Sequence, residues 1–119
     1  MSSVSFDQAQ ALERLGGDAD LLAQIAVIFR QTAPAKLAEI RQMLEAGNTD
    51  ALARAAHSLK GSVANFSAAR AWEAAKNLEM AGRGGQLGLA RPLAVQLEHE
   101  VQCLLSDLLT LAGGNACAS

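Results

Sequence analysis

The apolar residues of this chain recur with the spacing of amphipathic helices rather than of strands. Three long segments each place their apolar side chains in one narrow sector of a helix. Each of these stripes predicts a helix that buries one face and exposes the other. The stripes comprise Leu21, Leu22, Ile25, Ile28 and Phe29, continuing as Leu37, Ile40, Met43 and Leu44; then Leu52, Ala56, Leu59, Val63 and Phe66; and finally Leu93, Leu97, Val101, Leu104 and Leu108.

Capping signals bound the first two predicted helices. Ser5, with Gln8 three residues later, predicts a capping box and a short helix to about Leu15. A glycine pair ends this helix, and Asp18 then predicts the N-cap of the second one. Pro34 lies inside the second helix, where it removes one backbone donor, so we expect a kink there.

The remaining helices are bounded in the same way. The run Asn48-Thr49-Asp50 supplies capping oxygens and a negative first turn for the third helix. We expect Ser67 to cap a fourth helix over residues 68–83, which a second glycine pair ends. The last helix is expected to start near Leu89, with Pro92 tolerated in its first turn.

Short connections between these helices make neighbours antiparallel. The expected fold is therefore all-α: an antiparallel up-down four-helix bundle with a short extra N-terminal helix as a lid. At 119 residues, the chain is expected to form a single domain over 1–119. We expect order over about 5–112 and a mobile tail over 113–119.

Composition supports helices and excludes several classes of function. Half of the residues are apolar, largely Ala and Leu, and only 3% are aromatic. The formal net charge of −2 gives no indication of nucleic-acid binding. No apolar run reaches membrane-spanning length and no signal peptide is recognisable, so we expect a cytoplasmic protein without membrane insertion.

Metal and nucleotide chemistry lack the residues that they need. Cys103 and Cys117 do not have metal-ligand spacing and are interpreted as reduced thiols. A metal or haem bundle is disfavoured because only two histidines are present and neither belongs to a Glu-x-x-His pair. No glycine-rich loop is followed by the lysine of an ATP site. We therefore expect no metal site and no cofactor.

His57 is the residue with the clearest potential for chemistry. Helical geometry places it about 150° from the centre of the apolar sector of its helix, and therefore toward solvent. Its expected exposed neighbours, Ala53, Lys60, Gly61 and Ala64, are mostly small. A lone exposed histidine is usually an ordinary surface residue, but a neutral imidazole is also a good nucleophile near neutral pH.

The residues around His57 resemble a known signalling module. The run Ala56-His57-Ser58-Leu59-Lys60-Gly61 matches the Ala-His-x-Leu-Lys-Gly signature of the histidine-containing phosphotransfer (HPt) domain. Leu15-Gly16-Gly17-Asp18, residues 29–34 and Leu78-Glu79 resemble further family features in the expected order. The resemblance therefore covers most of the chain.

Two departures from the family pattern are apparent, one after the histidine helix and one in the fourth helix. Ser67 replaces a glycine that relatives carry ten residues after the histidine. Ala71 and Ala74 stand where relatives usually have leucine, and the bulky Trp72 lies off that stripe. Trp72 is interpreted as a core or half-buried residue, with a docking anchor as the alternative. These departures affect local packing more than function.

The resemblance implies a phosphorelay function. His57 would accept a phosphoryl group from the aspartyl-phosphate of a receiver domain and pass it to another receiver aspartate. The partners would be receiver domains of response regulators, a hybrid sensor histidine kinase, or both. Mg²⁺ would belong to the receiver, and the chain would be a phosphotransfer protein rather than an enzyme with its own ATP site. We expect a monomer.

Other residues receive supporting roles in this interpretation. Lys60, one turn after the histidine, would stabilise the charge of the phosphoryl oxygens. Gly61 would allow close approach of the partner. By analogy with the family, Glu79 lies near the phosphorylation site, and we hypothesise that it accepts a hydrogen bond from His57 and orients the ring.

The expected docking surface surrounds these residues. Ala53 and Ala64 would keep it flat and mildly apolar, while Lys76 or Arg83 would assist phosphate binding. The alternative is that Lys76, Glu79 and Arg83 form an ordinary solvated charged face.

His99 is the second histidine of the chain. His99 serves as an internal control, because Gln102 and Cys103 stand where a lysine and a glycine would be needed, so it is interpreted as a surface residue. The alternative function is an HPt-fold docking adaptor that binds a receiver or another signalling protein without carrying phosphate.

Overall fold

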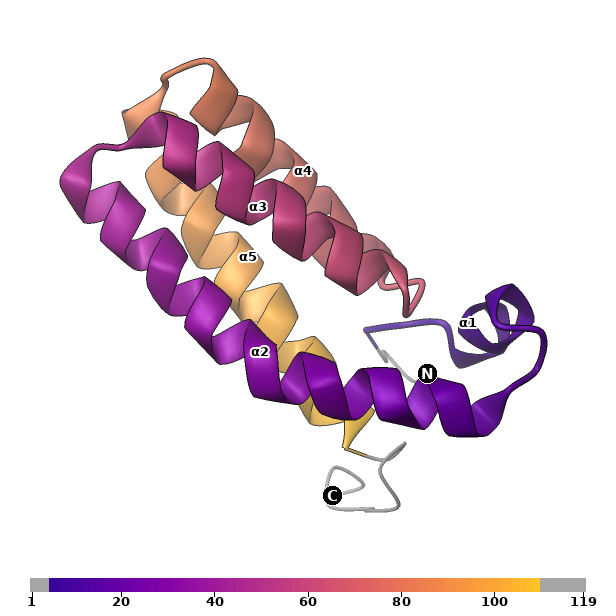
Figure 1. Cartoon of the computed structure of the whole chain (residues 1–119). Coiled ribbons are helices and arrows are strands. Elements are labelled where there is room, and N and C mark those ends of the chain that lie inside the picture. The colour runs from indigo at the N-terminus through magenta and orange to yellow at the C-terminus, as the bar shows by residue number, and fades with distance from the viewer. Residues whose placement is uncertain (1–4, 110–119) are drawn as a thin grey trace.

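The computed structural model describes residues 5–109, and all of its regular secondary structure within that range is helical. The predicted end of order near residue 112, the tail over 113–119 and Cys117 lie outside the described residues. Five helices follow one another along the chain (Figure 1): α1 (Gln8–Arg14), α2 (Ala19–Ala46), α3 (Thr49–Ala64), α4 (Ala69–Arg83) and α5 (Leu87–Leu108).

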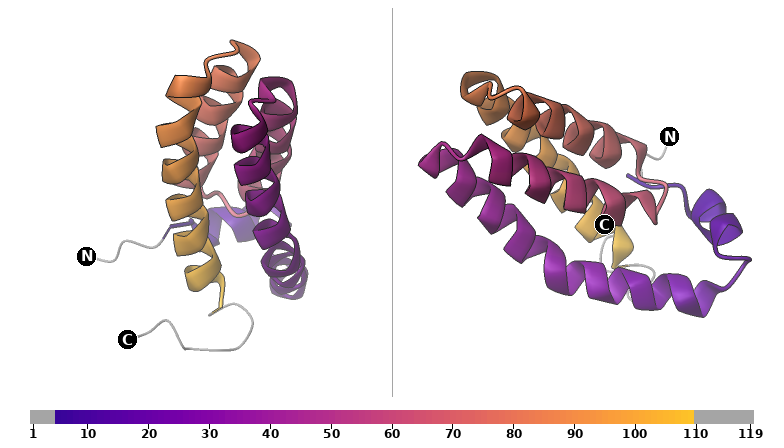
Figure 2. Two further views of the ribbon diagram at one scale, coloured as in Figure 1. Left: turned by 90° about the vertical axis from the view of Figure 1, so that its left-hand side faces the viewer. Right: turned by 45° about the horizontal axis from the view of Figure 1, so that its top comes forward.

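Helices α2 to α5 form a four-helix bundle, and α1 lies at one end of it (Figures 1 and 2). Each long helix packs against both of its neighbours around a ring, with α5 returning to contact α2. The predicted all-α, up-down bundle with a short N-terminal helix is therefore confirmed. In the described part of the chain, no helix is long and apolar enough to span a membrane.

The apolar sector of α3 is buried as its periodicity predicts. The side chains of Leu52, Ala56, Leu59, Val63 and Phe66 are each at most 2% exposed. Burial is less complete along the first half of α2, where Leu22 and Phe29 are buried but Ile28 remains 57% exposed.

The first helix is capped differently from the prediction. Asp7, not Ser5, is the N-cap, since its Oδ1 accepts a hydrogen bond from the backbone N–H of Gln10 at 3.0 Å. Ser5 instead donates its backbone N–H and its hydroxyl to Asp107 Oδ2 on α5, at 2.7 and 2.8 Å. The predicted capping box is wrong because α5 brings a carboxylate to Ser5, and hydrogen bonds to charged acceptors are the stronger ones.

Other helix boundaries agree with the sequence or shift by a few residues. Asp18 and Asn48 cap α2 and α3 as predicted, each accepting from a backbone N–H three residues later. Helix α2 continues through Pro34 and changes direction near its middle (Figure 2). Helix α5 begins at Leu87 rather than near Leu89. Pro92 therefore lies in its second turn, whereas the prediction placed it in the first.

The turn between α3 and α4 corrects the role predicted for Ser67. Its φ of 52° is left-handed, and its carbonyl accepts a hydrogen bond from Asp7 N–H at 3.2 Å. Its hydroxyl is buried and has no hydrogen-bond partner among residues 5–109. The N-cap of α4 is Ala68, which has no side-chain cap, so the prediction that Ser67 caps this helix is wrong. Glycine adopts a left-handed backbone without the steric cost that a Cβ imposes, so Ser67 occupies a position that favours glycine.

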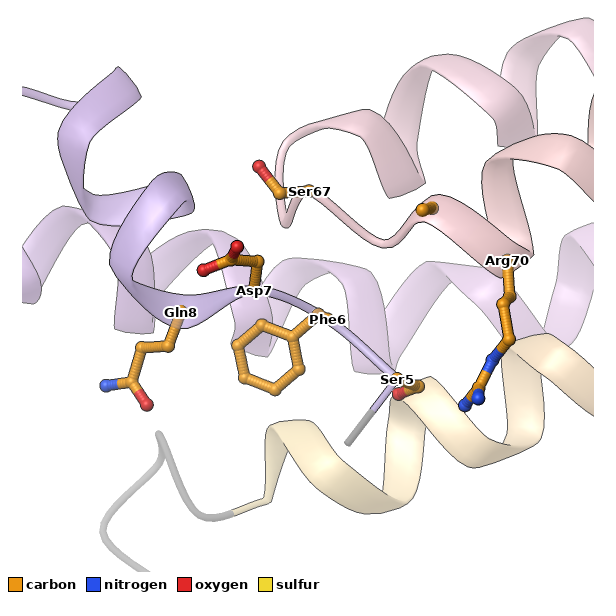
Figure 3. A pocket seen from close by; sticks show the side chains of 7 residues that line it. Ser5, Phe6, Asp7, Gln8, Ser67 and Arg70 are labelled. Carbon is orange, nitrogen blue, oxygen red and sulfur yellow. The ribbon is translucent and has the colours of Figure 1, made fainter. Parts of the chain in front are cut away.

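The N-terminal segment joins this turn to the rest of the bundle. Figure 3 shows it passing between the α3–α4 turn, which carries Ser67, and α5, with the side chain of Phe6 on the side away from Ser67. Together they border an open pocket that has no lining residue in common with the predicted site. The lining residues are Ser5, Phe6, Asp7, Gln8, Ser67, Ala69 and Arg70.

Candidate functional site

His57 projects from α3 into solvent. Its side chain is 61% exposed, while Ala56 beside it on the helix is fully buried. This contrast follows from the helical period, which turns neighbouring side chains by about 100° and so separates the buried face from the exposed one. The ring is therefore accessible to a second protein.

Glu79 of α4 contacts this ring. Its side chain is only 7% exposed, and its Oε2 lies 3.0 Å from His57 Nδ1. A hydrogen bond from Lys60 is the main cause that lowers the pKa of the Glu79 carboxyl to about 2; burial opposes it, and hydrogen bonds from Arg83 and His57 add to it. At neutral pH this carboxylate is ionised.

The ionised carboxylate fixes the tautomer of the imidazole. A carboxylate without a proton only accepts hydrogen bonds, so Nδ1 must carry the proton that it shares with Glu79. Because a neutral imidazole has one protonated nitrogen, Nε2 of His57 retains its lone pair. When the ring is neutral, the site therefore presents an exposed imidazole whose Nε2 carries no proton.

Two cations share the carboxylate with the histidine. Lys60 Nζ lies 2.9 Å from Glu79 Oε1, and Arg83 Nε lies 3.0 Å from Oε2. The side chain of Lys60 is 22% exposed, whereas that of Arg83 is 61% exposed. One negative charge thus holds two positive charges beside the imidazole, which leaves the cluster net positive.

Gly82 allows α4 to approach α3 closely enough for these contacts. A Cβ at this position would lie 3.0 Å from both Ala53 Cβ and the carbonyl oxygen of Thr49. The expectation that Ala53 is an exposed docking residue is wrong, since it is only 3% exposed. The helical geometry of α3 does not reveal which flank a second helix covers, and α4 covers the one with Ala53.

The other predicted residues lie around His57 with different exposures. Gly61 is exposed, while Ala64 and Lys76 are partly exposed. Trp72 is half-buried against the core, in agreement with the prediction, and its ring centroid lies 5.7 Å from Lys60 Nζ and 5.6 Å from Lys76 Nζ. The structure thus gathers His57, Lys60 and the charged stripe of α4, and their docking roles stay predictions.

Sequence reasoning missed two of these features. It did not identify Gly82, although a glycine inside a helix is costly and signals a packing requirement. It also did not place Trp72 against Lys60. That contact joins α3 to α4 and has no local signal.

His99 has a different environment on α5. It is exposed, and the contact recorded for its ring is with Cys103 Sγ, 3.8 Å from Nε2. Within residues 5–109, no carboxylate or cation pairs with this ring. Nor does that range contain a group of three or more His, Cys, Asp or Glu residues placed to hold a metal ion.

Comparison with known proteins adds a family to this geometry. The model of the family described as the Hpt domain matches residues 24–107, well over half of the chain, and this range includes the whole charged cluster. No match was found among curated proteins or among solved structures.

Proposed function

Because this chain belongs to the Hpt domain family, we propose that it is a phosphorelay intermediate that carries a phosphoryl group on His57. Hpt domains are phosphotransfer carriers rather than ATP-using enzymes. In the proposed reaction, His57 accepts the group from a receiver aspartyl-phosphate and passes it to the aspartate of another receiver. The observation that carries this proposal is the exposed imidazole whose Nδ1 donates to Glu79, which leaves Nε2 free to attack.

In the transfer step, His57 Nε2 displaces the receiver aspartate from phosphorus. The lone pair of His57 Nε2 forms a bond to phosphorus while the bond between phosphorus and the aspartyl oxygen breaks. The aspartate leaves as a carboxylate, and the Nδ1 proton stays on the ring. The imidazole therefore gains positive charge, which the ionised Glu79 stabilises through the existing 3.0 Å hydrogen bond. The return step reverses these changes.

The cations beside Glu79 serve the phosphoryl group. Phosphoryl transfer requires mainly alignment and stabilisation of negative charge on the equatorial oxygens. Lys60 is one helical turn from His57 and supplies a point charge for those oxygens, with Arg83 assisting from α4. Glu79 is thus a positioning residue both for the ring and for these cations.

Gly61 also supports the proposal that a partner protein docks at this site. It lies within α3, where glycine is less favourable than alanine by about 0.5–1 kcal/mol. A Cβ at this position would meet nothing within 4 Å. Packing within the described chain therefore does not explain the glycine, whereas close approach of a partner's active-site loop does.

The proposal also specifies the partners. They are receiver domains of response regulators or of a hybrid sensor histidine kinase, encountered in the cytoplasm. The protein acts as a monomer and holds no cofactor of its own, and the Mg²⁺ used in transfer belongs to the receiver. A docking adaptor that carries no phosphate remains the second candidate, but it requires neither a free Nε2 nor Lys60 beside it.

Incubation with phosphorylated receivers tests the proposal. Purified protein is mixed with radiolabelled aspartyl-phosphate forms of receiver domains from the source organism, and the label is mapped by mass spectrometry. We expect an acid-labile, base-stable label on His57, because phosphohistidine has this stability and aspartyl-phosphate does not. Label on another residue would overturn the assignment. Binding of receivers without any label would favour the adaptor.

A further inference from the structure

We propose that Trp72 is a positioning residue that fixes the ammonium group of Lys60 beside His57, and that its indole therefore senses phosphorylation of the histidine. This inference rests on the proposed phosphotransfer function.

The ammonium group of Lys60 is held from two directions. Its Nζ lies 2.9 Å from Glu79 Oε1 and 5.7 Å from the centroid of the Trp72 ring, within the range of a cation–π interaction. Lysine has a long and flexible side chain, so a single ion pair leaves its position poorly defined. The second contact restricts the ammonium to one place.

Trp72 is itself held by the protein. Its side chain is half-buried and packs against the hydrophobic core, in contrast to the exposed His57. The support therefore runs from the core through the indole to the lysine. A large rigid ring is suited to this role because it has few rotatable bonds.

A second ammonium group lies against the same ring. Lys76 Nζ is 5.6 Å from the Trp72 centroid, and in the described part of the chain no carboxylate forms an ion pair with it. The indole thus gathers two positive charges on the side of α4 that borders the phosphorylation site. An aromatic face attracts cations without neutralising them, so both charges stay available to an anion.

Phosphorylation would redistribute these contacts. A phosphoryl group brings a charge of about −1.5 to −2 and three strong acceptor oxygens. On Nε2 it would compete with Glu79 and the indole for Lys60. Movement of the ammonium toward the phosphate changes the electric field at the ring, and therefore the emission of the indole.

Fluorescence provides the first test. Trp72 is the only tryptophan and the chain has no tyrosine, so the indole emission comes from one residue. The protein is phosphorylated with phosphoramidate, whose P–N bond breaks as His57 attacks and whose nitrogen leaves as ammonia. We expect the emission to change in step with phosphorylation of His57, and this change to be absent in Lys60→Met. Unchanged emission in the phosphorylated parent protein would overturn the inference.

The second test is a double-mutant cycle on the rate of phosphorylation by the same donor. Trp72→Leu is expected to slow the reaction about three- to tenfold, whereas Trp72→Phe, which keeps an aromatic face, should remain within about twofold of the parent. In the Lys60→Met background, Trp72→Leu should have no further effect, because the residue acts through the lysine.

A space-filling role predicts a different result. In that case Trp72→Leu would slow the reaction equally with and without Lys60, and Trp72→Phe would show no particular rescue. Either outcome would overturn the positioning role while leaving phosphorylation of His57 intact. If His57 of the parent protein accepted no phosphoryl group from phosphoramidate or from any receiver, the proposed function itself would fail, and this inference with it.

Discussion

The two histidines of this chain are both exposed on helices, yet only one of them lies in the charged cluster to which we assign the proposed phosphoryl transfer. His57 on α3 donates to an ionised carboxylate from α4 that also holds two cations. His99 on α5 lies 3.8 Å from Cys103 Sγ and forms no ion pair within the described residues. Exposure makes both imidazole rings accessible, but only at His57 does a carboxylate on the neighbouring helix select the ring tautomer and hold cations beside it.

The chain also contains a second buried glutamate, which lies next to the other histidine in sequence. Glu100 is 8% exposed and pairs with Arg70 Nε at 3.2 Å and with Gln96 Nε2 at 2.8 Å. It adjoins His99 in sequence, but consecutive residues on a helix point in different directions and do not face each other. A histidine and a buried glutamate therefore occur twice, and they combine into a site only where two helices meet.

The largest effect is expected from exchanging the histidines for glutamine. His57→Gln should accept no phosphoryl group from a phosphorylated receiver, since the amide offers no nucleophilic nitrogen. His99→Gln should accept it at the parental rate. Quantifying acid-labile label after a fixed incubation checks both, with circular dichroism as the control for folding. Labelling of His57→Gln at the parental level would contradict the assignment of His57 as the phosphoryl acceptor.

Glu79→Gln is expected to have the next largest effect. The amide no longer stabilises the positive charge that develops on the ring, and hydrogen bonds to charged groups contribute about 1.5–3 kcal/mol. The rate of phosphorylation of His57 should therefore fall about ten- to a hundredfold in a single-turnover assay. Glu100→Gln is the matched control, because it alters a buried carboxylate that pairs with Arg70 rather than with His57, and it should leave the rate unchanged. Equal slowing in both variants would contradict a specific role for Glu79.

Gly82→Ala tests the close approach of the two helices that form the site. The added Cβ would lie 3.0 Å from Ala53 Cβ and from a backbone carbonyl of α3, so α4 must shift. We expect a loss of about 1–3 kcal/mol in the free energy of unfolding, measured with urea, together with slower phosphorylation. Gly88→Ala in α5 is the control: its Cβ would meet nothing within 4 Å, so stability should be unchanged or higher.

Ser67→Gly should stabilise the protein while leaving the site unaltered. The substitution relieves a left-handed φ of 52° and removes a buried hydroxyl that has no partner in the part of the chain that the structure describes. After the entropic cost of glycine, we expect a gain of about 1 kcal/mol in the free energy of unfolding. Ser67→Ala retains the left-handed strain and should gain less. A less stable glycine variant would refute this explanation of the turn.

The pH dependence of the stability that Glu79 contributes appears only on acidification. The pKa of Glu79 is about 2 in the folded protein, against an ordinary value of 4.5. Its charge therefore contributes stability fully above about pH 4.5, and this contribution is lost as the pH falls toward 2. The difference in unfolding free energy between the parent and Glu79→Gln should shrink over that interval. A difference that stays constant across it would contradict the ionised state assigned to this carboxyl.

Much of the fold could be predicted because the signals are local. The buried sector of α3 and the caps at Asp18 and Asn48 depend on residues within one or two helical turns. Predictions failed where a distant segment competed. Ser5 binds a carboxylate on α5 and Asp7 caps α1 in its place, while Ser67 adopts a left-handed turn whose carbonyl accepts a hydrogen bond from the N-terminal segment.

In the candidate site, too, features that depend on one helix were predictable, whereas contacts between helices were not. The sequence by itself determined that His57 lies on the exposed face of a helix, because the helical period alone decides which residues oppose the apolar stripe. Only the tertiary structure decided that α4 covers Ala53, that Glu79 reaches His57, and that Trp72 meets Lys60. The period of one helix is set by its own backbone geometry, whereas the contacts between two helices depend on how closely and on which flank they pack.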